Sequence, residues 1–452
     1  MEKFFKLKEN KTNVKTEIIA GVTTFMTIAY ILAVNPAILS VSGMDSNAIL
    51  VATAISASIG TLLMALLTNY PFALAPALGL NAYFAYTVCN TMGYSWQFAL
   101  LAVFVEGIIF IILSLVNARE AIFNAIPFQL KKGISIGIGF FVAFIGLVNA
   151  HIVVKSDATL VTLVNFHDNF STMGIGAILA IIGLLITVAL YEKHVKGSIL
   201  IGIFVTWGLG MLSQAIGLYQ PDVANGFYSL YPSLNNFDIT SITKTFGQCF
   251  NFSEIGKFNI IDFVIVMTTF LFIDIFDTIG SLIGCADKAK MLDKDGKLPK
   301  VKQALLSDAI ATSVGAILGT TTVTTYVESS TGIAAGGRTG LASVVTSILF
   351  LAALIFAPIF TAIPGFATAP ALIFVGFLII TTISEIKFDN LRESVPAYLV
   401  MISMPLLFSI SDGIAIGIIS YTVINILTGN AKKVSVLMYI LTILFAAKYI
   451  FL

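Results

Sequence analysis

Residues 320–340 read TTTVTTYVESSTGIAAGGRTG, with long apolar stretches on both sides. Five of the six residues in 332–337 are Gly or Ala, so the stretch is a poor candidate for a continuous spanning helix. Threonine and glycine favour extended or broken backbone, which is tolerated at membrane depth only when it is buried in protein or lines a cavity. The only acid here is Glu328, and a carboxylate at that depth indicates a functional site. The alternative is a solvated loop that carries one acid.

The composition of the 452-residue chain excludes a soluble globular protein. Apolar residues make up 58% and charged residues only 11%, with a mean hydropathy of +0.97, whereas soluble domains carry about 25% charged residues. The net charge of +1 argues against a nucleic-acid partner. The three cysteines are scattered and predict neither disulfides nor a metal site. We therefore expect a multi-pass membrane protein.

The rule of about 20 apolar residues per span predicts fourteen transmembrane segments. The first seven are 17–39, 48–67, the broken piece 76–91, 97–116, 133–148, 173–191 and 198–216. The second seven are 262–285, 304–319, the broken piece 325–337, 341–360, 369–383, 395–410 and 413–427. A last apolar run, 434–452, either spans the membrane or lies along its face.

The distribution of Lys and Arg gives the orientation. With residues 1–16 as a basic cytoplasmic tail, 21 of the 25 Lys and Arg residues fall on the inside, as the positive-inside rule requires. Lys155, Lys244 and Lys257 fall outside, and Lys448 lies in the ambiguous last run. The chain is thus predicted to lie in the cell membrane with a cytoplasmic N-terminus.

The two halves of the chain resemble each other. AISASIGTLL (54–63) parallels AIATSVGAIL (309–318), and a broken segment follows each, in the third position of its half. Because seven is odd, the second half would cross the membrane upside down relative to the first. Paired broken segments in an inverted repeat indicate a transporter site near the bilayer midplane.

Segment eight reads TTFLFIDIFDTIGSLIG and carries Asp274 and Asp277 within an apolar helix, three residues apart and so near one face. No Lys or Arg lies within a turn or two, and buried carboxylates of this kind suit proton transfer. The alternative is that one of them, Asp274 above all, braces a neighbouring broken backbone. Asp308, at the start of segment nine, is either functional or an acid at a helix N-terminus.

Other polar candidates are an amide, a further acid and several aromatic rings. Asn81, in the first broken piece, either contacts a ligand or caps the half-helix after it. Glu106 in segment four is expected to make a structural hydrogen bond. The aromatic candidates for stacking on a flat ligand, each of which is otherwise a packing residue, are Tyr30, Phe84, Tyr326 and Phe272.

Residues and motifs that the sequence lacks limit the possible mechanisms. All three histidines fall in predicted loops, which leaves carboxylates as the midplane proton carriers. The sequence has no phosphate-binding Gly-Lys-Ser/Thr loop, so ATP-driven transport is not supported. It also has no intramembrane Ser/His, Cys/His or metal-ligand constellation that would indicate an enzyme or a cofactor.

Four stretches resemble the AzgA-like purine permeases, a branch of the nucleobase–cation symporter family two. They are GVTTFMTIAYILAVNP, APALGLNAYFAY, TFLFIDIFDTIGSLIG and TTYVESSTGIAAGGRTGL, and the likeness runs from residue 17 to about 427. The resemblance implies an all-α fold of fourteen segments in a seven-plus-seven inverted repeat. It further implies proton-coupled uptake of adenine, guanine or hypoxanthine, often by a homodimer.

The resemblance also divides the chain into domains. The implied parts are the tail 1–16, a core domain of 17–117 and 262–360, a gate domain of 118–217 and 361–428, an extracellular loop 218–261 and the C-terminal run 429–452.

Carried over by motif, the substrate-binding residues are Asp277, Glu328 and Asn81, and Asp308 matches an acid that relatives need for activity. Where some relatives have an acid or histidine one turn after the segment-eight acid, this chain has Ser281. The coupling proton is therefore left to Asp277, Asp274 or Asp308.

The sequence thus predicts a proton:purine symporter that works by an elevator-like movement of the core against the gate. Its main rival is an anion transporter of the sulfate-permease type, which shares the architecture. Two midplane carboxylates argue against an anion site.

Overall fold

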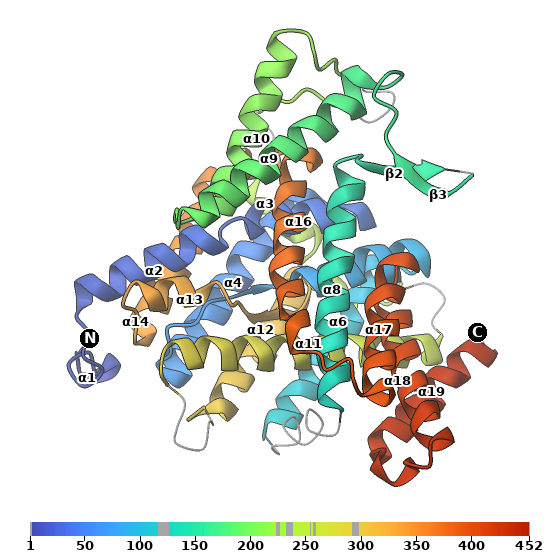
Figure 1. Ribbon diagram of the computed structural model, residues 1–452. Helices are drawn as coiled ribbons and strands as arrows, with labels where there is room; N and C mark the ends of the chain where they lie inside the picture. Colours follow the sequence, from blue (N-terminus) through green and yellow to red (C-terminus); the bar gives the residue numbers. More distant parts are fainter. Residues whose placement is uncertain are drawn as a thin grey trace.

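The computed structural model describes residues 2–115, 126–156, 158–222, 227–231, 238–253, 255, 259–291 and 298–451. The chain is mostly helical (Figure 1). The longer helices are α2 (Val14–Ile28), α3 (Ile31–Leu39), α4 (Ser46–Thr68), α6 (Trp96–Leu115), α8 (Phe128–Asn149), α9 (Ile175–Glu192), α10 (Ser198–Ala215), α11 (Ile260–Lys288), α12 (Val301–Leu318), α14 (Gly340–Ala352), α16 (Gly365–Ile380), α17 (Leu391–Leu406), α18 (Ile410–Leu427) and α19 (Val436–Phe451).

Ten helical stretches among the described residues are long and apolar enough to cross a membrane. They correspond to ten of the fourteen predicted segments. Two of the other four segments are the broken pieces, the third is the 29-residue helix α11, and the fourth is the 16-residue helix α17. The count of fourteen spans remains a prediction, as does the topology of α19, which packs on α18 and α11.

Both broken segments contain a short strand followed by a short helix. Strand β1 (Leu74–Pro76) leads into α5 (Leu78–Ala82), and β4 (Val323–Thr325) precedes α13 (Ser329–Ala334). The strands pair antiparallel, with Leu74 opposite Thr325 and Pro76 opposite Val323. They are fully buried in the middle of the protein, which is where backbone outside a helix is tolerated in a membrane.

The outer edge of each strand is satisfied by a threonine from the helix that precedes it. Thr61 Oγ1 of α4 accepts from Leu74 N at 2.9 Å and donates to Leu74 O at 3.1 Å. Thr312 Oγ1 of α12 makes the same two bonds to Val323, both at 3.3 Å. One residue on each outer edge thereby has both its N–H and its C=O group paired, which lowers the cost of strand backbone in an apolar environment.

The helices pack in two groups. Helices α4, α6, α12 and α14 contact one another around the strand pair, with α2 against α14 and α13. Helices α8, α9, α10, α16, α17 and α18 form the second group, in which α8 lies between α16 and α17 (Figure 1). Helices α6 and α12 of the first group pack closely at Gly107. A Cβ atom added at this position would lie only 2.9 Å from the backbone N of Ser313.

A hairpin and several short helical turns complete the fold. The hairpin pairs β2 (Val153–Ser156) with β3 (Leu160–Leu163), and the sequence did not predict it. The turns are α1 (Glu2–Phe5), η1 (Ser40–Ser42), the wide π-helical stretch η2 (Tyr83–Thr91), η3 (Phe170–Gly174), η6 (Ile239–Lys244), η7 (Gln248–Phe250), η8 (Ala353–Phe356), α15 (Ala357–Thr361), η9 (Thr381–Glu385) and η10 (Ala431–Lys433).

Some predictions fall on residues outside the described part. These are the boundary between core and gate at 117/118, parts of the loop 218–261, and the charges Arg119, Lys257, Lys294 and Lys297. The three histidines do lie in turns, as predicted.

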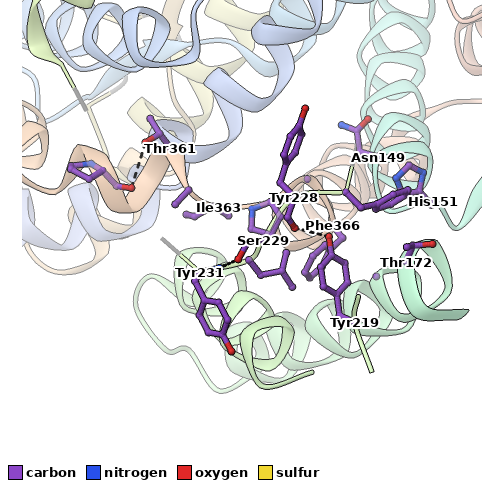
Figure 2. Close-up of a pocket in the computed structure, with 17 residues that line it drawn as sticks. Asn149, His151, Thr172, Tyr219, Tyr228, Ser229, Tyr231, Thr361, Ile363 and Phe366 are labelled. Carbon is purple, nitrogen blue, oxygen red and sulfur yellow. Dashed lines mark hydrogen bonds between the residues drawn. The ribbon is translucent and has the colours of Figure 1, made fainter. Parts of the chain in front are cut away.

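Two hollows lie away from the strand pair, near the end of α8. One, of about 430 Å³, lies beneath residues 227–231 (Figure 2). The other, of about 680 Å³, lies beside the β2–β3 hairpin. None of the described residues that line them is Asp or Glu.

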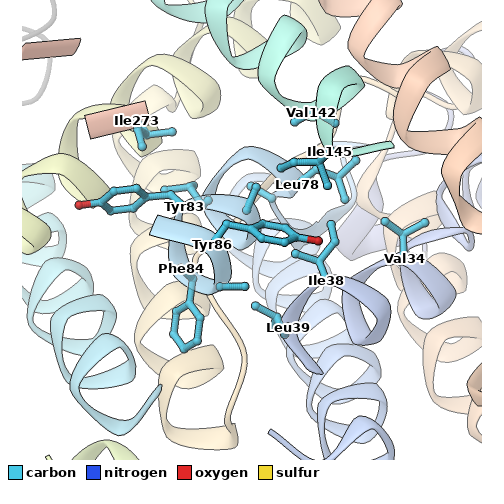
Figure 3. Packing of buried hydrophobic residues seen from close by; sticks show 14 of the residues in the cluster. Val34, Ile38, Leu39, Leu78, Tyr83, Phe84, Tyr86, Val142, Ile145 and Ile273 are labelled. Atoms are coloured by element: carbon cyan, nitrogen blue, oxygen red, sulfur yellow. The ribbon is translucent and has the colours of Figure 1, made fainter. Parts of the chain in front are cut away.

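The main apolar core surrounds η2 and joins it to both helix groups. Tyr83, Phe84 and Tyr86 project in three directions from η2, towards different neighbours (Figure 3). Phe84 is fully buried in this cluster.

Candidate functional site

The threonine run at the start of the quoted stretch is the structural centre of the candidate site. Five of its hydroxyls bond polar side chains, and each of these comes from a different helix. The pairs are Thr320 with Asn35 of α3 (3.0 Å), Thr321 with Asn81 of α5, Thr322 with Glu106 of α6 (2.9 Å), Thr324 with Asp277 of α11 (3.0 Å) and Thr325 with Asp308 of α12 (3.0 Å). We call this set the threonine hub. It ties five helices to β4 and the three residues before it.

Two acids near the hub differ from the rest in their accessibility. Asp277 is exposed although it lies near the middle of α11, and Glu328 is half-buried just before α13. Tyr30, at the break between α2 and α3, donates its hydroxyl to Glu328 Oε1 at 2.8 Å. Tyr30 also lies close enough to Asp277 for an electrostatic interaction. The structure therefore brings Asp277, Glu328 and Tyr30 together.

Asn81 is the member of the hub that lies on the first broken segment. Its Oδ1 accepts from Thr321, while its buried Nδ2 has no hydrogen-bond partner among the described residues. Asn81 lies inside α5, and the residue at the N-cap is Ala77, which has no capping side chain. The alternative interpretation of Asn81 as a helix cap is therefore wrong. A buried amide nitrogen of this kind is a donor ready for a ligand.

Three further carboxylates are buried, and each accepts a hydrogen bond either from a threonine of the hub or from its own helix. Asp274 Oδ1 accepts from Thr278 on the same helix at 2.7 Å. Asp308 lies two turns into α12, so its interpretation as an acid of the first helical turn is wrong. Glu106 makes the expected structural hydrogen bond, but with a threonine next to a broken segment, which the sequence did not indicate.

The aromatic candidates separate into two kinds. Tyr326 is buried beside the acids, and its hydroxyl donates to the carbonyl of Pro76 in the paired broken segment. Phe84 and Phe272 are buried in the main apolar core, and nothing places them beside Glu328. Of the four rings, Tyr30 and Tyr326 are thus the ones that the structure brings to the acids.

The sequence interpretation named four of the hub's five side-chain partners but missed Asn35 and the threonines that join them. Asn35 donates to both Thr53 (2.6 Å) and Thr320, which joins segments one and two to the hub. Glu17, at the other end of segment one, accepts from the backbone N–H groups of Arg338 (2.9 Å) and Thr339 (3.2 Å). An isolated amide or acid within an apolar segment was the signal that could have identified them.

Together the acid pair, the Asn81 amide and the tyrosine rings can bind a small planar molecule by its polar edge. Carboxylates accept hydrogen bonds, the free amide nitrogen donates one, and tyrosine rings give flat apolar contact. Among the described residues, no group of three His, Cys, Asp or Glu side chains is placed to hold a metal ion.

Comparison with known proteins gives a family match and close relatives. The profile described as "Permease family", that of xanthine/uracil permeases, matches residues 15–416. The permease MJ0326 of Methanocaldococcus jannaschii is 47% identical over 100% of this chain and 98% of its own length. The guanine/hypoxanthine permease PbuO of Bacillus subtilis is 42% identical, covering 98% of each chain. The adenine permease AdeP of Escherichia coli K12 is 39% identical over 100% of this chain and 96% of its own.

Solved structures with a similar fold are distant in sequence. The transmembrane domain of the cyanobacterial bicarbonate transporter BicA aligns with a TM-score of 0.61 at 14% identity, covering 90% of this chain and 97% of that one. SLC26A9 aligns with a TM-score of 0.59 at 10% identity, covering 92% and 67%. At this identity the likeness shows the fold and no more.

Proposed function

Because this chain belongs to the permease family of xanthine and uracil permeases, we propose that it is a symporter that imports a purine nucleobase together with a proton. The observation that carries the proposal is the accessible acid pair, Asp277 and Glu328, beside a hydrogen-bonded hub. Named relatives transport adenine or guanine and hypoxanthine, so all three bases are candidate substrates.

The two acids and the amide would bind the edge of the base. Asp277 and Glu328 would accept from ring or exocyclic N–H groups, and Asn81 Nδ2 would donate to a ring nitrogen or carbonyl oxygen. Tyr30 and Tyr326 would pack beside the ring, and Phe84 would act from the core by supporting η2. Thr324 and Tyr30 hold one oxygen of each acid and leave the other for the ligand.

Asp277 is the best placed of the three candidates for the coupling proton. The carboxylates of Asp274 and Asp308 are fully buried, and each accepts from a protein hydroxyl. Asp277 keeps accessible surface beside the hub, and we infer that its carboxyl would be the one to exchange a proton with water during the transport cycle. We therefore assign proton transfer to Asp277 and structural roles to the other two.

The proposed mechanism moves a core against a gate. The first helix group, with the strand pair and α11, would form the core, and the second group would form the gate. The equivalent threonine clamps of Thr61 and Thr312 support an inverted repeat of seven segments each. An elevator-like movement of the core would then expose the acids to each side in turn. We also propose a cytoplasmic N-terminus and a homodimer in the cell membrane.

Uptake of labelled hypoxanthine, guanine and adenine into cells without purine permeases tests this proposal. Wild type, Glu328→Gln and Asp277→Asn are compared at equal surface expression, with Asp168→Asn, an exposed loop acid, as the matched control. We expect saturable uptake that a protonophore abolishes, reduced at least tenfold in both acid variants and unchanged in the control. Absence of uptake in the wild type, or competition by sulfate or bicarbonate, would favour the anion rival.

The proton assignment has a separate readout. In proteoliposomes, Asp277→Asn is expected to lose proton-driven accumulation while exchange of internal for external base is less affected, because exchange needs no net proton movement. Equal loss of accumulation and exchange would show that Asp277 serves binding alone.

A further inference from the structure

The smaller hollow is a preformed site away from the acid pair. We call it the tyrosine cavity, after Tyr219, Tyr228 and Tyr231 in its wall (Figure 2). Its volume of about 430 Å³ falls within the range of roughly 300–1,000 Å³ that is typical of small-molecule sites. Phe227 and Phe366 add two further aromatic rings to its lining.

The wall formed by residues 228–230 is held by hydrogen bonds that are buried or part-buried. The hydroxyl of Tyr219 donates to the carbonyl of Tyr228 at 2.8 Å. Trp207 Nε1 donates to the carbonyl of Leu230 at 2.8 Å, and Gln214 Oε1 accepts from the N–H of Leu230 at 2.7 Å. The cavity therefore does not depend on a ligand for its shape.

Two polar side chains at one side of the cavity have hydrogen-bonding groups that bond none of the described residues. Asn149 Oδ1 accepts from Tyr86 at 3.3 Å, but Asn149 Nδ2 bonds none of the described residues. The His151 ring lies 5.6 Å from the ring of Phe227 and is likewise without a hydrogen bond to the described part of the chain. Burial lowers the pKa of His151, so its imidazole is neutral at pH 7 and offers one donor and one acceptor.

The lining also restricts the charge of an occupant. None of the described lining residues is Asp, Glu, Lys or Arg. A charged ligand would therefore lose its hydration without a counter-ion. A neutral, flat ligand with both donors and acceptors on its edge matches the aromatic walls and the Asn149–His151 pair.

The cavity is connected to the proposed transport path. Asn149, His151 and Gly365 also line the larger hollow, which extends between Ala37 of α3 and Phe144 of α8. Helix α3 lies within residues 17–117, which the resemblance assigns to the core, and α8 belongs to the proposed gate. The bond from Tyr86 to Asn149 further ties the cavity to η2, which continues from the helix that carries Asn81.

We propose that the tyrosine cavity is a second binding site, for a neutral purine ring that is either free or attached to a sugar. The ring would lie against the aromatic walls, with its edge on Asn149 Nδ2 and the His151 imidazole. The choice of a purine rests on the proposed function. Binding of the purine at this site would not require transport through the acid pair, and it would not require a proton.

Tryptophan fluorescence tests the proposal. The chain has two tryptophans, and Trp207 holds the cavity wall through Leu230, so Trp96→Phe leaves a single reporter next to the cavity. The full-length protein in detergent is titrated with hypoxanthine and with inosine, in a background that also carries Asp277→Asn and Glu328→Gln. We expect a saturable change in Trp207 emission despite the disabled acid pair.

Variants of the cavity then assign the response. His151→Ala and Asn149→Ala are each expected to raise the dissociation constant about threefold to tenfold, as loss of one hydrogen bond implies. His194→Ala, an exposed histidine in another turn, should leave it unchanged. Equilibrium dialysis of labelled hypoxanthine replaces fluorescence if Trp96→Phe fails to fold.

The outcomes separate this inference from transport. Loss of all binding in the acid-pair background, or an unchanged dissociation constant in both His151→Ala and Asn149→Ala, would overturn the second site. Binding of inosine alone would identify the sugar-linked purine as the ligand, and binding of hypoxanthine alone the free base. If uptake fails but the change in Trp207 fluorescence on titration is still seen, the proposed symport is rejected and the second site is supported.

Discussion

The hydroxyl of Tyr30 offers the sharpest test of how the acid pair is built. Tyr30→Phe keeps the buried ring and removes only the donor that lies 2.8 Å from Glu328 Oε1. A hydrogen bond to a charged group contributes about 1.5–3 kcal/mol, and about 1.4 kcal/mol is a factor of ten in an equilibrium constant. If this bond orients Glu328 for the substrate, the variant should raise the KM for uptake about tenfold to a hundredfold.

The assay is initial-rate uptake over a range of base concentrations, normalised to surface expression. Tyr439→Phe is the matched control, because it removes a tyrosine hydroxyl that donates to the carbonyl of Ala431 at 3.0 Å, far along the chain from the acids. We expect a normal KM in the control. A wild-type KM in Tyr30→Phe, or an equal rise in both variants, would refute the role assigned to the Tyr30 hydroxyl.

Two stability predictions follow from contacts outside the acid pair. Gly107→Ala should lower the melting temperature in detergent by several degrees, since its Cβ would lie 2.9 Å from Ser313 N and force α6 away from α12; an unchanged melting temperature would show that these helices can separate freely. Asp45→Ala should destabilise by about 1 kcal/mol through loss of the N-cap bond to Ala48, whereas Lys244→Ala removes only the surface ion pair with Asp45 and should destabilise less, because exposed ion pairs contribute little. The reverse order in thermal unfolding would contradict this.

The sequence was most informative where composition alone restricts the backbone. Glycine and threonine in residues 320–340 predicted a departure from helix, and the structure has β4 and the short helix α13 there. The motif around Asn81 predicted a second such break, which is present as β1 and α5. These features are local, since they depend on the conformational preferences of neighbouring residues.

What the sequence could not supply is the partner of each polar group. Nothing near Glu106 or Asp308 in the chain indicates that Thr322 and Thr325 bond them. These pairs depend on how distant helices pack around the strands.

The pairing of β1 with β4 has a consequence for how the protein is made. The ribosome must synthesise the chain as far as Thr325 before Leu74 acquires its partner. Until then, the first broken segment enters the bilayer with strand N–H and C=O groups that lipid cannot satisfy, and Thr61 can cover only one edge. The insertion machinery must therefore shield the nascent first half from lipid until β4 has been synthesised. Fragments that end before β4 should be recognised by membrane quality control and degraded.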